Sequence, residues 1–402
     1  MAQDKNRKTL NVPPLRFPGF TDEWKQYTID EMANIYGRIG FRGYTTADLV
    51  EKGNGVISLS PSNIINNQLH TDKDNTYISF YKYEESPEIK IYEGDVIFVK
   101  TGSTVGKVAY VDKLDCKATL NPQLVVFKDI KCNKYLLGQI LATSKIQKDI
   151  SKITVGGAVP TLSQTELGKV RISLPEEQEQ RKIASFLTLL DERIATQNKI
   201  IEDLKKLKSA IIDGHFNGLN VNSKIGDFIH EVSNRNKMNT DLSVLSVSNQ
   251  QGFIAQSEQF ENRVIASDDT SNYKIVIKDD FAYNPARINV GSIARLVNYE
   301  SGIVSPMYIC FRCSDEILPD YLELFFQSRY FQLEVEKRLE GSVRLCLSMN
   351  GIKSIHFRLL PICEQKALTE KLKAIQSKLD NEEMMSLLYQ AQRKYLLTAM
   401  FI

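Results

Sequence analysis

The strongest constraint on the fold of this chain is that its sequence repeats once, at an offset of about 185 residues. DVIFVKTGSTVGKVAYV (95–111) resembles DFAYNPARINVGSIARL (280–296): an acidic residue, an apolar run, a polar loop ending in Val-Gly and a second apolar run. NPQLVVFK (121–128) likewise resembles SPMYICFR (305–312). Self-similarity at a fixed offset indicates one structural unit written twice. We therefore expect two related domains of mixed structure.

Each copy of the repeat is followed by a helical stretch. Leu174-Pro175 and Leu360-Pro361 come shortly before Glu179-Gln180 and Glu364-Gln365. Proline is tolerated at the start of a helix, and acidic residues in the first turn interact favourably with the helix dipole. The polar, Gly/Asn-rich segment 214–223 predicts the boundary between the copies.

The first of these helices has the heptad pattern of a coiled coil. Its seam includes two polar members, Gln197 and Lys208, and the apolar members Ile183, Leu187, Leu190, Ile194, Ile201, Leu204 and Ile211. The second helix is less regular, with Leu368, Leu372, Ile375, Leu379, Met384, Met385, Leu388 and Tyr395. Each helix could simply pack on its own domain. Because the stripe recurs at matching places in the repeat, we expect the two helices to pair with each other, in antiparallel orientation.

Composition limits the class of protein. The 402 residues are 42% hydrophobic and 25% charged, which suits two or three folded domains. The 51 Lys+Arg residues nearly balance the 49 Asp+Glu residues, so a nucleic-acid surface would have to be a local patch. The polar start lacks the apolar core of a signal peptide, and no run is long enough to span a membrane. We expect a cytoplasmic protein, not associated with a membrane, whose six cysteines are free thiols.

Three motifs resemble known sites but depart from them. GSTVGK (102–107) has three residues between its glycines where a phosphate-binding loop needs four, so a turn between two strands is expected. Asn121–Leu124 and Asn284–Arg287 lack the second proline and the aromatic of the loop with which amino-methyltransferases hold adenine. Cys310 and Cys313 have no second pair at zinc-site spacing. We therefore expect no catalytic residue, metal site or bound cofactor in this chain.

Polar residues in the loops of both copies are suited to contact DNA. Arginine pairs with guanine and asparagine with adenine, whereas lysine, serine and threonine commonly hold phosphates. In the first copy the candidates are Arg38, Arg42, Tyr44, Lys100, Thr101, Ser103, Thr104, Lys107, Gly156 and Gly157. In the second copy they are Asn284, Arg287, Asn289, Ser292 and Arg344. Any one of them could be ordinary solvated surface, so the prediction depends on the set.

Three segments resemble the specificity subunits of type I restriction-modification enzymes: PPLRFPGFTDEW (13–24), GDVIFVKTGSTVGKVAYV (94–111) and the passage from VGGAVPT to LLDERI (155–194). The resemblance covers nearly the whole chain. It implies two target-recognition domains that each read one half of a split DNA site and are held apart by the paired helices. It also implies that two modification subunits, which methylate adenine, dock on this chain and that restriction subunits join them. S-adenosylmethionine and ATP would then be bound by those partners.

The sequence therefore predicts an α+β chain, with two mixed α/β target-recognition domains in tandem repeat and two long helices that pair as an antiparallel coiled coil. The expected parts are an N-terminal arm (1–23), a first recognition domain (24–175), a central spacer helix (176–215), a second recognition domain (216–361) and a C-terminal spacer helix (362–402). The expected function is non-catalytic recognition of a bipartite sequence in double-stranded DNA. A helical scaffold without DNA readout and an orphan DNA methyltransferase or nuclease remain as alternatives.

Overall fold

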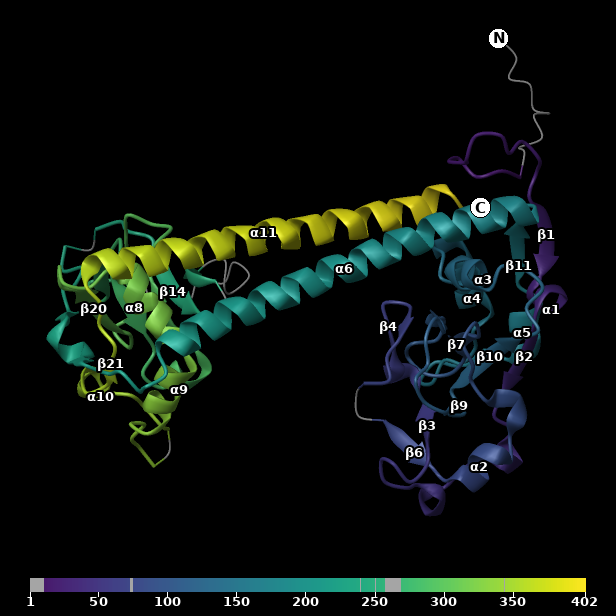
Figure 1. Cartoon of the computed structure of the whole chain (residues 1–402), viewed down its shortest axis with the longest axis horizontal. Helices are drawn as coiled ribbons and strands as arrows, with labels where there is room; N and C mark the ends of the chain where they lie inside the picture. Colours follow the sequence, from purple (N-terminus) through teal and green to yellow (C-terminus); the bar gives the residue numbers. More distant parts are fainter. Residues whose placement is uncertain (1–10, 73–74, 239, 250, 257–268, 343) are drawn as a thin grey trace, which may run out of the picture. The chain divides into compact units, whose positions relative to one another are not determined.

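The chain divides into two compact units, each containing one copy of the repeat (Figure 1). Unit 1 comprises Met1–Thr196 and Ser386–Ile402, and unit 2 comprises Gln197–Met385. The computed structural model describes residues 11–72, 75–238, 240–249, 251–256, 269–342 and 344–402. The first ten residues of the predicted N-terminal arm lie outside the described residues.

Unit 1 is built on a six-stranded sheet that is buried on both faces. The strand order is β2-β10-β7-β8-β5-β4. The strands are β2 (Asn34–Gly37), β10 (Leu124–Lys128), β7 (Val96–Val99), β8 (Val108–Tyr110), β5 (Gln68–Leu69) and β4 (Ile64–Ile65). In β7, Val96 and Phe98 belong to one apolar cluster, and Ile97 and Val99 belong to another. Burial of both faces explains why these strands are continuous apolar runs in the sequence.

Helices cover one face of this sheet and a second sheet covers the other. The helical layer contains α3 (Lys134–Leu141), α4 (Ser144–Ile153) and the start of α6 (Glu177–His215). The second sheet has the order β6-β3-β9, with β6 (Thr76–Ile78), β3 (Val56–Leu59) and β9 (Ala118–Leu120). A ribbon of β1 (Lys25–Thr28) and β11 (Arg171–Leu174) and the short helices α1 (Ile29–Met32), α2 (Phe80–Glu84) and α5 (Gln164–Gly168) complete the unit (Figure 1).

Unit 2 repeats this architecture, which confirms the predicted tandem repeat. Its main sheet, β13-β20-β17-β18, corresponds to β2-β10-β7-β8. Its second sheet has the order β15-β14-β19-β16, of which β15-β14-β19 corresponds to β6-β3-β9. β14 and β3 are each antiparallel to one neighbour and parallel to the other. The strands are β12 (Ser223–Lys224), β13 (Ile229–Val232), β14 (Val244–Ser248), β15 (Gly252–Ala255), β16 (Lys274–Ile277), β17 (Phe281–Tyr283), β18 (Ile293–Arg295), β19 (Ser301–Val304), β20 (Ile309–Cys313) and β21 (His356–Phe357). The helices are α8 (Pro319–Phe326), α9 (Arg329–Glu336), α10 (Met349–Lys353) and part of α11 (Ile362–Ala399).

The repeat extends to individual hydrogen bonds. Gln180, buried in the first turn of α6, accepts a hydrogen bond from the Asn133 N–H and donates one to the Pro175 carbonyl, each at 2.9 Å. Gln365, in the first turn of α11, makes the same two bonds at 2.8 Å with residues 185 positions further along the chain. Each glutamine thereby ties the start of a long helix to the loop before a helix of its own unit and pairs backbone groups that burial would otherwise leave unsatisfied.

α6 buries the seam that the sequence predicts. Every predicted seam position is buried or half-buried, including Gln197 and Lys208. Within unit 2, the Gln197 side chain donates to the Glu382 carbonyl (3.1 Å), and the Lys208 ammonium donates to the Gln376 amide oxygen (2.8 Å). Residue numbers rise along α6 as they fall along α11, so the pairing is antiparallel, as predicted.

The predicted seam is wrong in the later part of α11. Met384, Met385, Leu388 and Tyr395 are between 39% and 64% exposed. The heptad phase of Leu372 and Leu379 continues instead through Ser386, which is buried, and Arg393, which is half-buried. Arg393 is accommodated within unit 1 because its guanidinium pairs with the Asp191 carboxylate. No helix in the described ranges combines the length and apolarity that a membrane span requires.

The end of the N-terminal arm packs on α6 within unit 1. The Arg16 guanidinium donates two hydrogen bonds, of 2.7 and 2.6 Å, to the fully buried carboxylate of Glu179. Phe17 meets Phe186 edge-on at a centroid distance of 5.6 Å. The Leu15 N–H donates to the Ala399 carbonyl at 2.9 Å. The arm and the last turn of α11 therefore belong to one packed structure.

Candidate nucleic-acid interface

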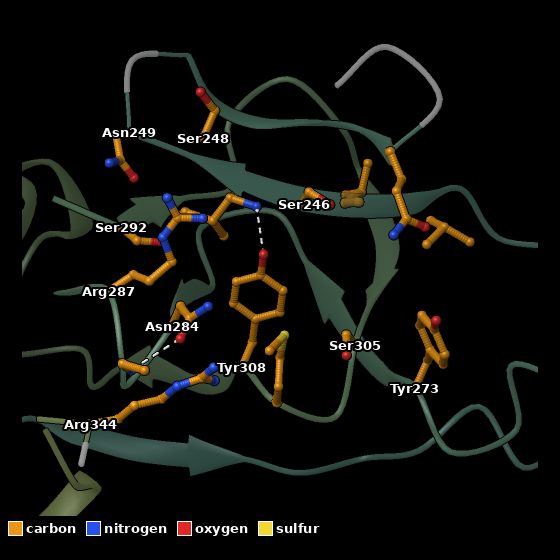
Figure 2. Close-up of a pocket in the computed structure, with 16 residues that line it drawn as sticks. Ser246, Ser248, Asn249, Tyr273, Asn284, Arg287, Ser292, Ser305, Tyr308 and Arg344 are labelled. Atoms are coloured by element: carbon orange, nitrogen blue, oxygen red, sulfur yellow. Dashed lines mark hydrogen bonds between the residues drawn. The ribbon is translucent and has the colours of Figure 1, made fainter. Parts of the chain in front are cut away.

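Unit 2 contains a cleft of about 830 Å³, in which polar side chains stand among apolar ones (Figure 2). Strand β14, the loop between β17 and β18, the residues before β20 and the turn that carries Arg344 supply its walls. The lining includes Ser246, Ser248, Asn249, Gln256, Tyr273, Asn284, Arg287, Ser292, Ser305, Met307, Tyr308 and Arg344. Among the described residues that line it, none is acidic. The cleft therefore offers hydrogen-bond donors and two positive charges to whatever enters it.

The loop between β17 and β18 forms one wall on a fixed backbone. The Asn284 N–H donates to the Ser292 carbonyl (3.1 Å), and the Arg287 N–H donates to the Asn284 carbonyl (3.0 Å). The Asn284 side-chain oxygen also accepts from the Ala286 N–H at 3.0 Å, so this side chain helps to hold the turn. Gly291 has φ +89°, a conformation that favours glycine. The Arg287 side chain is exposed on this framework.

A second turn braces the other side of the cleft. The backbones of Glu340 and Cys346 are paired by two hydrogen bonds, of 2.9 and 2.8 Å. Gly341 has φ +123°, and a Cβ there would lie 2.3 Å from the Arg344 carbonyl, so only glycine fits. The Leu347 N–H donates to the carbonyl of residue 285 at 3.0 Å. This bond places the turn beside the β17–β18 loop and brings Arg344 to the cleft that Arg287 lines.

The sequence alone did not identify the remaining wall. The Tyr308 hydroxyl accepts a hydrogen bond from the Val247 N–H at 3.4 Å, and the Asn249 side chain donates to the Val290 carbonyl at 2.7 Å. In β14, Ser246 and Ser248 alternate with apolar residues of the core, as a half-buried strand requires. That alternation in VLSVS is the signal that could have found the serines. Tyr308 stands in an apolar run and gave no such signal.

Unit 1 builds the same framework from residues 185 positions earlier. The Val99 N–H donates to the Lys107 carbonyl (2.9 Å), as Asn284 does to Ser292. The segment Val155–Thr161 closes a turn with two hydrogen bonds, of 3.0 and 2.8 Å, and its Gly156 has φ +98°. The Leu162 N–H donates to the Lys100 carbonyl at 2.8 Å. GSTVGK is thus a turn between β7 and β8, as predicted, and it lies beside the VGGA segment.

The predicted residues of unit 1 fall into two groups. Around the paired turns, Ser103, Lys107, Gly156 and Gly157 are exposed, and Lys100, Thr101 and Thr104 are half-buried. The Lys107 ammonium donates to the Ile64 carbonyl at 3.3 Å. In unit 2, Arg287, Asn289 and Arg344 are exposed, whereas Asn284 and Ser292 are buried. Asn289 does not belong to the described lining of the cleft.

The second group consists of Arg38, Arg42 and Tyr44, and these residues make contacts within unit 1. The Arg38 side chain is only 5% exposed and donates to the Leu120 carbonyl (2.9 Å) and the Thr119 hydroxyl (3.1 Å). Its guanidinium lies 5.2 Å from the Tyr44 ring centroid, and burial lowers its pKa. Arg42 pairs with Glu88 at 3.4 Å. The expectation that Arg38 faces DNA is corrected accordingly, because its donors join two sheets of the protein.

Fold and cleft together define a class of protein: two units of one architecture, each presenting polar loops on a glycine-braced framework and each attached to a pair of long helices. Residues 21–206 match the family model described as a type I restriction modification DNA specificity domain. The chain is therefore similar to the specificity subunits of type I restriction-modification enzymes.

Known members of the family show how far the similarity extends. The chain is 27% identical over 340 residues to the type I restriction enzyme MjaX specificity subunit of Methanocaldococcus jannaschii, covering 74% of this chain and 75% of that one. It is 20% identical over 201 residues to the HindI specificity subunit of Haemophilus influenzae, covering 48% and 41%. The crystal structure of the type I S subunit from M. genitalium has the same fold, with a TM-score of 0.58, 15% identity and coverage of 97% and 99%.

Proposed function

We propose that this chain reads a bipartite sequence in double-stranded DNA for a type I restriction-modification complex, one half-site per unit. The observation that carries the proposal is the cleft of unit 2, where two exposed arginines and several amide and hydroxyl groups meet without an acidic neighbour in the described lining. Such a cleft suits DNA, whose phosphates are negative and whose guanine edge presents hydrogen-bond acceptors. The matching framework in unit 1 supports a second reader.

The two long helices set the spacing of the half-sites and dock two modification subunits, which restriction subunits join. Several apolar side chains on these helices support a docking role because they are exposed: Leu189, Leu207, Met384, Leu387 and Leu388. Exposed apolar surface is typical of sites where proteins associate. The partners bind S-adenosylmethionine and ATP in this proposal. The chain itself binds no cofactor, performs no chemistry and works in the cytoplasm.

Two measurements on the complex reconstituted with modification subunits test this proposal. DNA affinity should fall steeply as salt rises, because binding releases counterions from the phosphates. A map of methylated adenines in the host genome should show one split motif that requires this chain. A complex whose affinity for DNA does not change with salt would point to a scaffold. Methyl transfer by the rigorously purified chain alone would point to a methyltransferase.

A further inference from the structure

Each unit has the same framework, a strand-connecting loop beside a glycine-containing turn, but the side chains at the tips of the loop and the turn differ. Arg287 of unit 2 stands where unit 1 has Gly102, and Arg344 stands where unit 1 has Val159, at the same offset of 185 residues. Equivalent main-chain bonds close the two turns of each unit, between 155 and 161 and between 340 and 346, and join them to the neighbouring loops. The framework is therefore held by the backbone, and the side chains at its tips are free to differ. Unit 2 has two guanidinium groups at places where unit 1 has none.

Both arginines line the cleft, and among the described residues their guanidinium groups have no hydrogen-bond partner. Within the described part of the chain, neither Arg287 nor Arg344 has a carboxylate partner. Two other arginines of unit 2 behave differently, since Arg295 pairs with Asp320 at 2.7 Å and Arg312 pairs with Asp280 at 2.6 Å. Figure 2 shows Arg287 and Arg344 approaching the cleft from separate loops, with Asn284 and Tyr308 between them.

The chemistry of the cleft favours guanine over the other bases. In the major groove guanine presents two acceptors, O6 and N7, and the forked guanidinium can donate to both at once. Adenine presents one donor beside its acceptor, which suits an amide better. Main-chain hydrogen bonds hold the loop under each arginine, so binding has to order the side chains more than the backbone.

We propose that unit 2 recognises a half-site that contains guanine and that Arg287 and Arg344 are specificity-determining residues, each reading one G·C pair. This inference rests on the proposed function, namely DNA readout by the cleft. Unit 1 reads its half-site without an arginine at the equivalent positions. The two halves of the target therefore differ in the kind of contact that defines them.

Competition binding with the reconstituted complex tests the inference. The competitors are duplexes in which each base pair of the methylated site is replaced in turn. For the wild-type complex, replacing either guanine read by unit 2 should weaken binding by about 5- to 150-fold. Arg344→Gln and Arg287→Gln should each abolish this preference at one position and leave the other half-site unchanged. Arg344→Lys keeps the charge but not the fork, so it should also lose the preference.

Other outcomes would overturn the inference. If the glutamine variants weaken binding to every duplex equally and lower the salt slope by about one, the arginines hold phosphates. If the lysine variant keeps the wild-type base preference, or if the unit 2 half-site contains no G·C pair, the assignment is wrong. Arg329→Gln is a matched control because Arg329 is exposed on α9 and lies outside the described lining of the cleft. A wild-type complex with no base preference at any position would instead refute the proposed function.

Discussion

At the scale of single residues, buried polar side chains stabilise equivalent points of the two units. Asp280 is fully buried, accepts from the Ile277 N–H at 2.9 Å and pairs with Arg312. Asp95, 185 positions earlier, accepts from a backbone N–H at 2.8 Å and pairs with Lys128. A buried carboxylate is tolerated when its oxygens are paired in this way. These pairs hold a tight turn against the main sheet of each unit.

His215, at the end of α6, should make the stability of the folded protein depend on pH. Burial, assisted by the charge of Arg358, lowers the pKa of His215 from its usual 6.5 to about 4, and the ring is hydrogen-bonded to the Tyr321 hydroxyl at 2.8 Å. In the unfolded chain this histidine takes up its proton near pH 6.5. The unfolded state therefore binds more protons between pH 6.5 and about 4, and the free energy of unfolding should fall as the pH falls through this window.

Chemical denaturation at pH 7.5 and pH 5 checks this prediction. His215→Gln should lose less stability than the wild type when the pH is lowered, because the variant has no imidazole to protonate. His230→Gln, which removes an exposed histidine on β13, should behave like the wild type. An unchanged pH dependence in His215→Gln would show that other groups cause the loss.

At the scale of elements, the sequence predicted α6 better than α11. The heptads of α6 are mostly apolar, so the periodicity alone gave the seam. On α11 the seam passes through Ser386 and Arg393, while exposed methionines and leucines lie beside it. Arg393 can occupy the seam because Asp191 on α6 and Gln139 on α3 receive its donors. Such partners come from distant parts of the chain, and no pattern within α11 reveals them.

If the paired helices act as a spacer, a change in their length should change the gap between the two half-sites of the target. Seven residues inserted after Ala195 in α6, with seven more after Leu387 in α11, keep the heptad phase of both helices. The pair lengthens by about 10 Å at 1.5 Å per residue, close to three base pairs at about 3.4 Å each. A methylome should show both half-sites retained and the gap between them increased.

The matched control is the same insertion in α6 alone, which shifts its seam against α11 and should lower the stability of the chain. Four residues added to both helices would rotate the seams by about 40° past a full turn and provide a second comparison. An unchanged gap with both half-sites retained would contradict the spacer role of the helices.

At the scale of the whole molecule, the repeat was the part of the structure that the sequence predicted best. Matching apolar runs located the strands of both units, and four of the polar residues chosen in the second copy line the cleft: Asn284, Arg287, Ser292 and Arg344. Arg38 was misplaced because its Gly-punctuated surroundings are typical of a loop. Its partners, Thr119 and Leu120, lie 81 and 82 residues away, so only the tertiary structure shows that it is buried.

Because the units are independent, exchanging one unit should change the recognition of one half-site only. Replacing residues 24–175 with the equivalent domain of a related specificity subunit should change one half of the methylated motif and leave the other intact, because each unit has its own framework and loops. The methylome of the host with each version of the chain checks this. The reciprocal exchange of residues 216–361 should change the other half, and a simultaneous change of both halves would contradict separate readers.

The glycine-braced turns also bear on how such a protein acquires new targets. Gly156 and Gly341 set the backbone, and main-chain hydrogen bonds close each turn, so the exposed side chains of Val159 and Arg344 contribute little to folding. Surface substitutions of this kind usually change stability by no more than about 0.5 kcal/mol. Mutation can therefore explore many tip sequences while the protein stays folded, and a new preference can arise in one half-site before the other changes. The residues proposed to choose the base are therefore not the residues that hold the fold, and this separation makes the proposed recognition evolvable.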